Sequence, residues 1–167
     1  KFADSSKISD RAIQRGFNQV GTLGSGNHYL EVQINHTSNV FNKEIAKKIG
    51  IHSDQQILIM VHCGSRGVGH QIATDYLKIF ESAMKKYNIA VPDRELSCAP
   101  FQSEEGQDYY KAMACAANMA YANRQVITHK IREAFSKVFK QKAENLGMEL
   151  IMDNTHNLAR KFKYKEK

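Results

Sequence analysis

Two hydrophobic periodicities alternate along this chain, and they restrict the fold more than any other feature of the sequence. Residues 28–34 alternate apolar and polar side chains, which is typical of a half-buried strand. Residues 57–61 are continuously apolar, as in a strand that is covered on both faces. Residues 148–152 form a third short apolar run after Gly147. We expect a strand in each of these stretches.

The segments between these runs have helical spacing instead. Residues 69–87 carry an apolar stripe, Ser103 is a suitable N-cap for an alanine-rich helix, and residues 124–142 carry a second helical stripe. Strands and helices therefore interleave, which predicts an α+β fold with a mixed sheet. The 167 residues contain no repeat and no linker rich in proline or serine, so we expect residues 1–167 to form one domain segment.

Composition excludes a membrane-spanning helix and favours an anionic partner. No apolar run approaches the ~20 residues that span a bilayer, and the first residues lack the apolar core of a signal peptide. Three widely spaced cysteines without a CxxC pair indicate a reducing compartment, so we expect a cytoplasmic protein, or a nuclear and cytoplasmic one in a eukaryote. The net charge of +7 favours nucleic acid, although solvated lysine faces are the alternative.

Three histidines fall at the ends of the three expected strands. His28 opens the first strand after a glycine-rich turn, His62 closes the second, and His156 follows the third. Rigid elements deliver such side chains to a shared rim, and neutral imidazole is the commonest metal ligand, so the three could hold Zn²⁺, Mn²⁺ or a similar ion. The alternative for each is a hydrogen-bonded structural histidine. Strand alternation puts Glu31 and His28 on opposite faces.

Two glycine-rich segments lie beside these histidines. The turn at residues 21–27 lets the chain fold tightly while Asn27 offers an amide to a phosphate or a sugar. The loop at residues 63–70 has Arg66 among glycines at a helix start, where backbone N–H groups and a guanidinium favour phosphate. This loop is neither a Walker A motif nor a GxGxxG motif. The alternative is a tight strand-to-helix connection with a surface arginine.

The chain resembles the RtcB family of RNA ligases in five motifs that occur in the family's order and cover essentially the whole sequence: GTLGSGNHYLEVQ, MVHCGSRGVGHQIATDYL, PDRELSCAPFQSEEGQDYY, ANRQVITHKIREAFSKVF and DNTHNLA. The resemblance implies an enzyme of tRNA splicing and RNA repair. Such enzymes join RNA ends bearing a 2′,3′-cyclic phosphate or 3′-phosphate to 5′-hydroxyl ends, through a histidine-guanylate intermediate. It also implies GTP, Mn²⁺ (two ions per complete site), RNA such as tRNA halves as substrate, and an archease-type activator.

Carried over position by position, the resemblance assigns a role to each of the residues singled out above. It implies metal binding by His28, His62 and His156. It implies guanylate contacts by Asn27, His28, Tyr29, Leu30, Glu31, His156 and Asn157. It implies that Arg66 holds an RNA phosphate.

The family also has residues that match nothing in this sequence. Its members carry an Asp and a bridging Cys upstream of these motifs, and their nucleophilic histidine lies in a downstream HGAGR-type motif. We therefore expect a slice of the family's catalytic domain with no catalytic residue of its own, the nucleophile lying beyond Lys167, and with no activity as an isolated chain. The alternatives are a non-catalytic RNA-end- or metal-binding module, a subunit of a split ligase and, least supported, a metal-dependent phosphoesterase.

Overall fold

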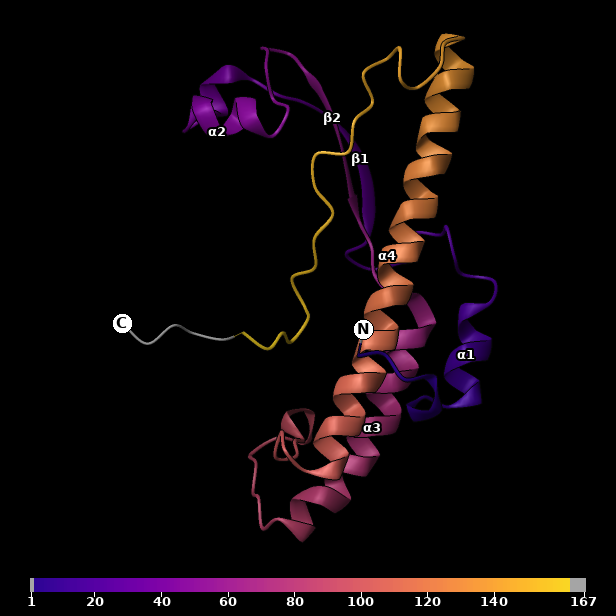
Figure 1. Ribbon diagram of the computed structural model, residues 1–167, viewed down its shortest axis with the longest axis vertical. Helices are drawn as coiled ribbons and strands as arrows, with labels where there is room; N and C mark the ends of the chain where they lie inside the picture. Colours follow the sequence, from indigo (N-terminus) through magenta and orange to yellow (C-terminus); the bar gives the residue numbers. More distant parts are fainter. Residues whose placement is uncertain (1, 163–167) are drawn as a thin grey trace. The chain divides into compact units, whose positions relative to one another are not determined.

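The computed structural model describes residues 2–162, and it consists of helices and one small sheet (Figure 1). In chain order, the main elements are α1 (Asp10–Gly16), β1 (Tyr29–Ile34), α2 (Lys43–Lys48), β2 (Ile57–His62), α3 (Arg66–Lys86) and α4 (Glu104–Phe139). Short 3₁₀ turns occur at Ser5–Lys7, Thr37–Asn39 and Arg94–Leu96. This composition agrees with the predicted α+β class. None of the described helices is both long enough and apolar enough to cross a bilayer.

The two strands predicted near the first two histidines are present. β1 and β2 pair antiparallel, with Tyr29 opposite His62 and Ile34 opposite Ile57, and their bounds differ from the predicted ones by one residue. Their apolar side chains are less covered than the sequence predicts, because Val32 is 57% exposed and Ile57 is 51% exposed. The prediction that β2 is covered on both faces is therefore wrong within the described chain.

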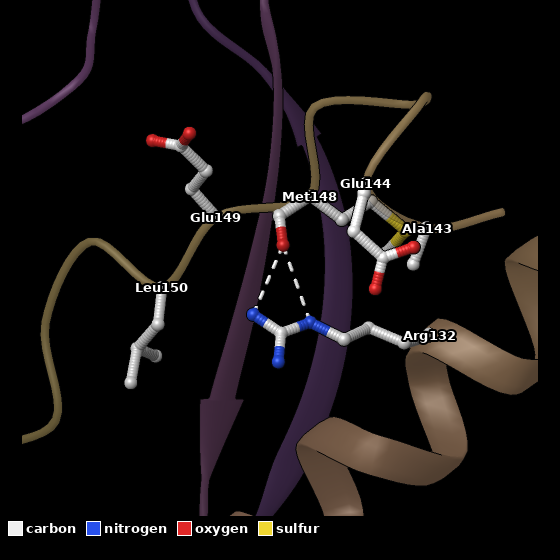
Figure 2. A pocket seen from close by; sticks show the side chains of 6 residues that line it. All are labelled: Arg132, Ala143, Glu144, Met148, Glu149 and Leu150. Carbon is white, nitrogen blue, oxygen red and sulfur yellow. Dashed lines mark hydrogen bonds between the residues drawn. The ribbon is translucent and has the colours of Figure 1, made fainter.

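The strand predicted for residues 148–152 is not formed, and the segment has no regular structure. The Met148 carbonyl accepts two hydrogen bonds from the Arg132 guanidinium, at 3.2 Å from Nε and 3.0 Å from Nη2 (Figure 2). An apolar run forms a strand only where a neighbouring strand satisfies its backbone groups, and no described segment pairs with this one. The sheet of the described residues is thus two-stranded and antiparallel, and the predicted mixed sheet is not confirmed.

Helix α4 runs unbroken where the sequence predicted two helical stretches. Ser103 caps it as expected, since the Gly106 N–H donates to Ser103 Oγ at 3.1 Å. No glycine or proline occurs in residues 107–139, so nothing interrupts the hydrogen bonding along the helix.

The described chain divides into two compact units. The first unit contains residues 2–19, 65–120 and 154–162, and the second contains residues 20–64 and 121–153. The core of the first unit consists of Ala12, Val68, Ile72, Tyr76, Phe80 and Ala112. Rings from α3 and α4 meet there, with the centroids of Phe80 and Tyr109 5.2 Å apart. The second unit contains the β1–β2 pair, and with it two of the three predicted site histidines.

Candidate metal and nucleotide site

His28 and His62 come together at one end of the β1–β2 pair. Their ring centroids are 5.7 Å apart and the rings meet edge to face, at an angle of 75°. His62 lies opposite Tyr29 and shares its face of the sheet, so the Tyr29 ring is 5.4 Å from the His62 ring. His28 precedes the first paired residue, so the strand alternation does not determine where its side chain points. His28 can therefore contact His62, although strict alternation would place their two side chains on opposite faces of the sheet.

The separation of the two rings suits a shared cation. Metal–nitrogen bonds of about 2.1 Å put two imidazole rings on one tetrahedral ion with their centres roughly 5 Å apart. Imidazole nitrogens suit Zn²⁺, Cu²⁺, Fe²⁺ and Ni²⁺, and Mn²⁺ would also take oxygen ligands such as carboxylates and water, so the identity of the ion stays a prediction. Within either unit of the described chain, no group of three or more His, Cys, Asp or Glu side chains is arranged to hold a metal ion. The pair thus offers two ligands, and a bound ion would need others.

His156 and Asn157 belong to the first unit. Both are exposed and lie in an irregular segment after α4. His28 and His62 are therefore the two predicted ligands that the second unit brings together, and metal binding by His156 stays a prediction.

The residues predicted to contact a guanylate are mostly exposed around the start of β1. Asn27, Leu30 and Glu31 are exposed, while Tyr29 is half-buried and donates its O–H to Met60 Sδ at 3.1 Å. Glu31 accepts a hydrogen bond from Gln33 Nε2 at 2.7 Å, which places it on the same face as Tyr29. These side chains are accessible to a ligand, and their assignment to a guanylate stays a prediction.

Arg66 begins α3 with an unusual backbone conformation. Its φ of 55° lies in the left-handed region, which costs free energy in a residue other than glycine and recurs at functional sites. The next N–H, that of Gly67, donates to Gln19 Oε1 at 2.7 Å. One of the backbone donors predicted to cradle a phosphate is thus already used by a side chain, and the predicted phosphate site depends on the Arg66 guanidinium.

The two cavities described below do not coincide with the predicted site. One in the second unit, of about 370 Å³, is lined by Arg132, Ala143, Glu144, Met148, Glu149 and Leu150 (Figure 2). The Arg132 guanidinium in this cavity donates its hydrogen bonds to the Met148 carbonyl, as described above. Another of about 360 Å³ in the first unit includes Lys7, Asp75 and Asp108. Neither is lined by a site histidine. Cys63, next to His62 in the sequence, is a small buried side chain that is only 6% exposed.

The sequence reasoning missed Asn123, which is completely buried in α4. It bonds to the glycine-rich turn before β1 and to the turn after β2, at Gly21, Thr22 and Gly64. A signal was present, because Ala112, Ala120, Asn123 and Ile127 follow one another at helical spacing and all are buried. A lone amide in such a stripe must find polar partners, since a buried polar group without them costs about 1–3 kcal/mol.

Comparison with known proteins identifies the family of the chain. The family model described as tRNA-splicing ligase RtcB matches residues 1–167. The tRNA-splicing ligase RtcB of Methanococcus maripaludis is 56% identical over 161 residues, covering 96% of this chain and 33% of the relative. That of Methanocaldococcus jannaschii is also 56% identical, covering 96% of this chain and 16% of the relative. That of Nanoarchaeum equitans is 50% identical, covering 95% of this chain and 32% of the relative.

The chain therefore belongs to the RtcB family of tRNA-splicing ligases, as its motifs indicated. It spans a third or less of the length of these relatives.

Proposed function

We propose that this chain carries part of the active site of an RNA ligase that uses GTP and Mn²⁺. The whole enzyme would join RNA ends that bear a 2′,3′-cyclic phosphate or 3′-phosphate to 5′-hydroxyl ends, in tRNA splicing or RNA repair. The family membership of the chain supports this ligase activity. The observation that carries the chain's own share is the contact between His28 and His62, with ring centroids 5.7 Å apart beside the glycine-rich turn.

In this proposal, the side chains of the chain bind and orient the reactants. His28 and His62 hold the cation through ring nitrogens, with His156 as a third ligand. A bound Mn²⁺ would neutralise phosphate charge and polarise phosphorus toward attack. Asn27 and Asn157 contact the guanosine nucleotide through their amides, and Arg66 fixes the RNA phosphate through its guanidinium.

The nucleotide part of the proposal is tested by binding of GTP to the chain with and without Mn²⁺, measured by calorimetry. We expect binding that requires Mn²⁺ and that falls at least tenfold in Asn27→Ala. Asn118→Ala is the matched control, since Asn118 is exposed on α4 and outside the predicted site. Equal affinity for GTP with and without Mn²⁺ would contradict a shared metal and nucleotide site.

Covalent chemistry separates the proposal from its alternatives. The chain contains no HGAGR-type motif, so we expect no labelled protein after incubation with radiolabelled GTP and Mn²⁺. A covalent guanylate on this chain would show that it holds a nucleophile of its own, and would exclude the non-catalytic binding module. Mn²⁺-dependent release of phosphate from an RNA 3′-phosphate would instead support the phosphoesterase.

A further inference from the structure

We infer that Asn123 and Arg124, two consecutive residues of α4, are positioning residues for the proposed metal site. Together, as the anchor pair, they fasten three backbone segments: the turn that leads to His28, the turn that follows His62, and the end of the segment that leads to His156. The inference rests on the proposed function for the role of the histidines, but the contacts of the anchor pair stand by themselves.

Asn123 joins two segments that are more than 40 residues apart in the sequence. Its Oδ1 accepts hydrogen bonds from the N–H groups of Gly21, at 2.7 Å, and Thr22, at 3.1 Å. Its Nδ2 donates to the carbonyl groups of Thr22 and Gly64, both at 3.0 Å. Every main partner is a backbone group with a fixed role as donor or acceptor, so the amide has one satisfied orientation. The side chain is completely buried, which makes these bonds expensive to break.

Gly64 brings Asn123 next to the histidine pair. A Cβ built on Gly64 would lie 3.9 Å from His28 Nε2, which is ordinary contact distance. The carbonyl that Asn123 holds therefore belongs to a residue that lies beside the His28 ring, where a side chain would meet that ring. Gly64 is also two residues after His62 in the sequence. The Asn123 amide thus fixes the backbone of the turn before His28 and of the turn after His62.

Arg124 fastens the third segment. Its Nε lies 2.5 Å from Asp153 Oδ1, and the side chain is only 12% exposed. The guanidinium is 4.6 Å from the centre of the Tyr121 ring, and Nη1 donates a long hydrogen bond to the Cys63 carbonyl at 3.5 Å. Asp153 is three residues before His156 in the sequence. Arg124 therefore connects the residue after His62 with the start of the DNTHN motif.

Groups that hold metal ligands in position have a measurable effect on metal affinity. Loss of a group that hydrogen-bonds a metal ligand typically weakens metal binding by 10- to 100-fold, and we expect a group that fixes the backbone beside two ligands to act at the lower end of that range. Asn123→Asp keeps the shape and both accepting contacts, but it places a carboxylate oxygen against two backbone carbonyls. Arg124→Lys keeps the charge and loses the planar fork that binds Asp153. The controls are Asn118→Asp and Arg11→Lys, which make the same changes at exposed positions.

The test is titration of the 167-residue chain with MnCl₂ by calorimetry, together with thermal unfolding of each variant. We expect at least a tenfold loss of Mn²⁺ affinity in Asn123→Asp and at least a threefold loss in Arg124→Lys. The two controls should stay within twofold of the unchanged chain. Variants that unfold cooperatively and bind Mn²⁺ with unchanged affinity would overturn the inference.

A second measurement keeps the anchor pair testable if the unchanged chain binds no Mn²⁺, a result that would count against the proposed metal site alone. Nuclear magnetic resonance would follow hydrogen exchange at the Gly21 and Thr22 amides and the contact between the His28 and His62 rings. In Asn123→Ala, we expect at least tenfold faster exchange of both amides and loss of the ring contact. Unchanged exchange and an unchanged ring contact would overturn the positioning role directly. If Asn123→Ala does not fold, Arg124→Lys is compared by the same ring contact, which we expect to weaken.

Discussion

Gly21 packs so closely against Val126 of α4 that no side chain fits between the two residues. A Cβ built on Gly21 would lie 2.5 Å from Val126 Cγ1, and the φ of Gly21 is 75°. The turn before His28 thus needs glycine here for two reasons: the left-handed backbone and the close approach of the helix. A glycine-rich segment beside a histidine is in this case also a packing feature.

Replacing two glycines of the same turn separates these reasons. Gly26 has nearly the same φ of 74°, but nothing lies within 4 Å of a Cβ built there. Gly26→Ala should cost about 1 kcal/mol of unfolding free energy, from backbone strain alone. Gly21→Ala should cost roughly 2–4 kcal/mol, because overlap with Val126 adds to the same strain. Urea denaturation measures both, and equal costs would contradict the close approach.

Much of the local structure could be predicted from the sequence, because it depends on neighbours along the chain. Strands form at Tyr29–Ile34 and Ile57–His62, each within one residue of the predicted bounds, and Ser103 caps α4. The predicted strand at residues 148–152 failed because a strand needs a partner, and a pattern does not reveal one. The α4 helix continues through the point where its apolar stripe changes, since propensity alone gives no reason to stop.

The candidate site also has a part that the sequence could predict and a part that it could not. The pairing of two adjacent strands puts Tyr29 opposite His62 and brings His28 near that end of the sheet, which sequence reasoning could predict, whereas the direction of the His28 side chain could not be predicted. Asn123 was missed because its partners lie 59 to 102 residues away. Its importance depends on tertiary contacts that no local pattern specifies.

Acid should lower the free energy of unfolding of the first unit, because it protonates Glu105. The Lys86 ammonium, 2.9 Å from Glu105 Oε1, and the Tyr87 hydroxyl lower the pKa of Glu105 to about 2. An unfolded glutamate titrates near 4.3, so this stabilisation is present above about pH 4.3 and is lost as the pH falls toward 2. Glu105→Gln should flatten the pH dependence of unfolding in that window. The exposed Glu44→Gln should not. Parallel pH dependence in Glu105→Gln and the unchanged chain would contradict the pairing.

Alkali should weaken the same unit through Tyr76. Burial, with a smaller contribution from the Asp108 charge, raises the pKa of Tyr76 to about 12, and its O–H donates to the Lys7 carbonyl at 2.9 Å. The unfolded tyrosine ionises near pH 10, so the stabilisation is complete below pH 10 and is lost as the pH rises toward 12. Tyr76→Phe should cost about 1 kcal/mol at neutral pH and reduce the alkaline loss. Tyr110→Phe is the control, and an unchanged alkaline slope in Tyr76→Phe would contradict the assignment.

Substitutions of Arg66 should change the stability of the chain and its affinity for RNA in different ways. Arg66→Gly relieves the left-handed backbone and removes the guanidinium, so the chain should become about 1 kcal/mol more stable. Arg66→Ala keeps the strain. Both variants should bind a short RNA with a 3′-phosphate more weakly, by about 1.5–3 kcal/mol, as expected for loss of a charge-assisted hydrogen bond. The same RNA with a 3′-hydroxyl is the reference. Equal binding of the two RNAs by the unchanged chain would contradict the predicted phosphate contact.

The most direct test of the account is Mn²⁺ binding to four single-histidine variants and one double variant of the chain, measured by calorimetry. His28→Ala and His62→Ala should each weaken binding at least tenfold, and the double variant should lose little more than either one, because the two rings share an ion. His36→Ala and His52→Ala, at exposed loop positions, should bind Mn²⁺ as the unchanged chain does. Unchanged affinity in His28→Ala or His62→Ala, or an equal loss in the two loop variants, would contradict the shared metal site.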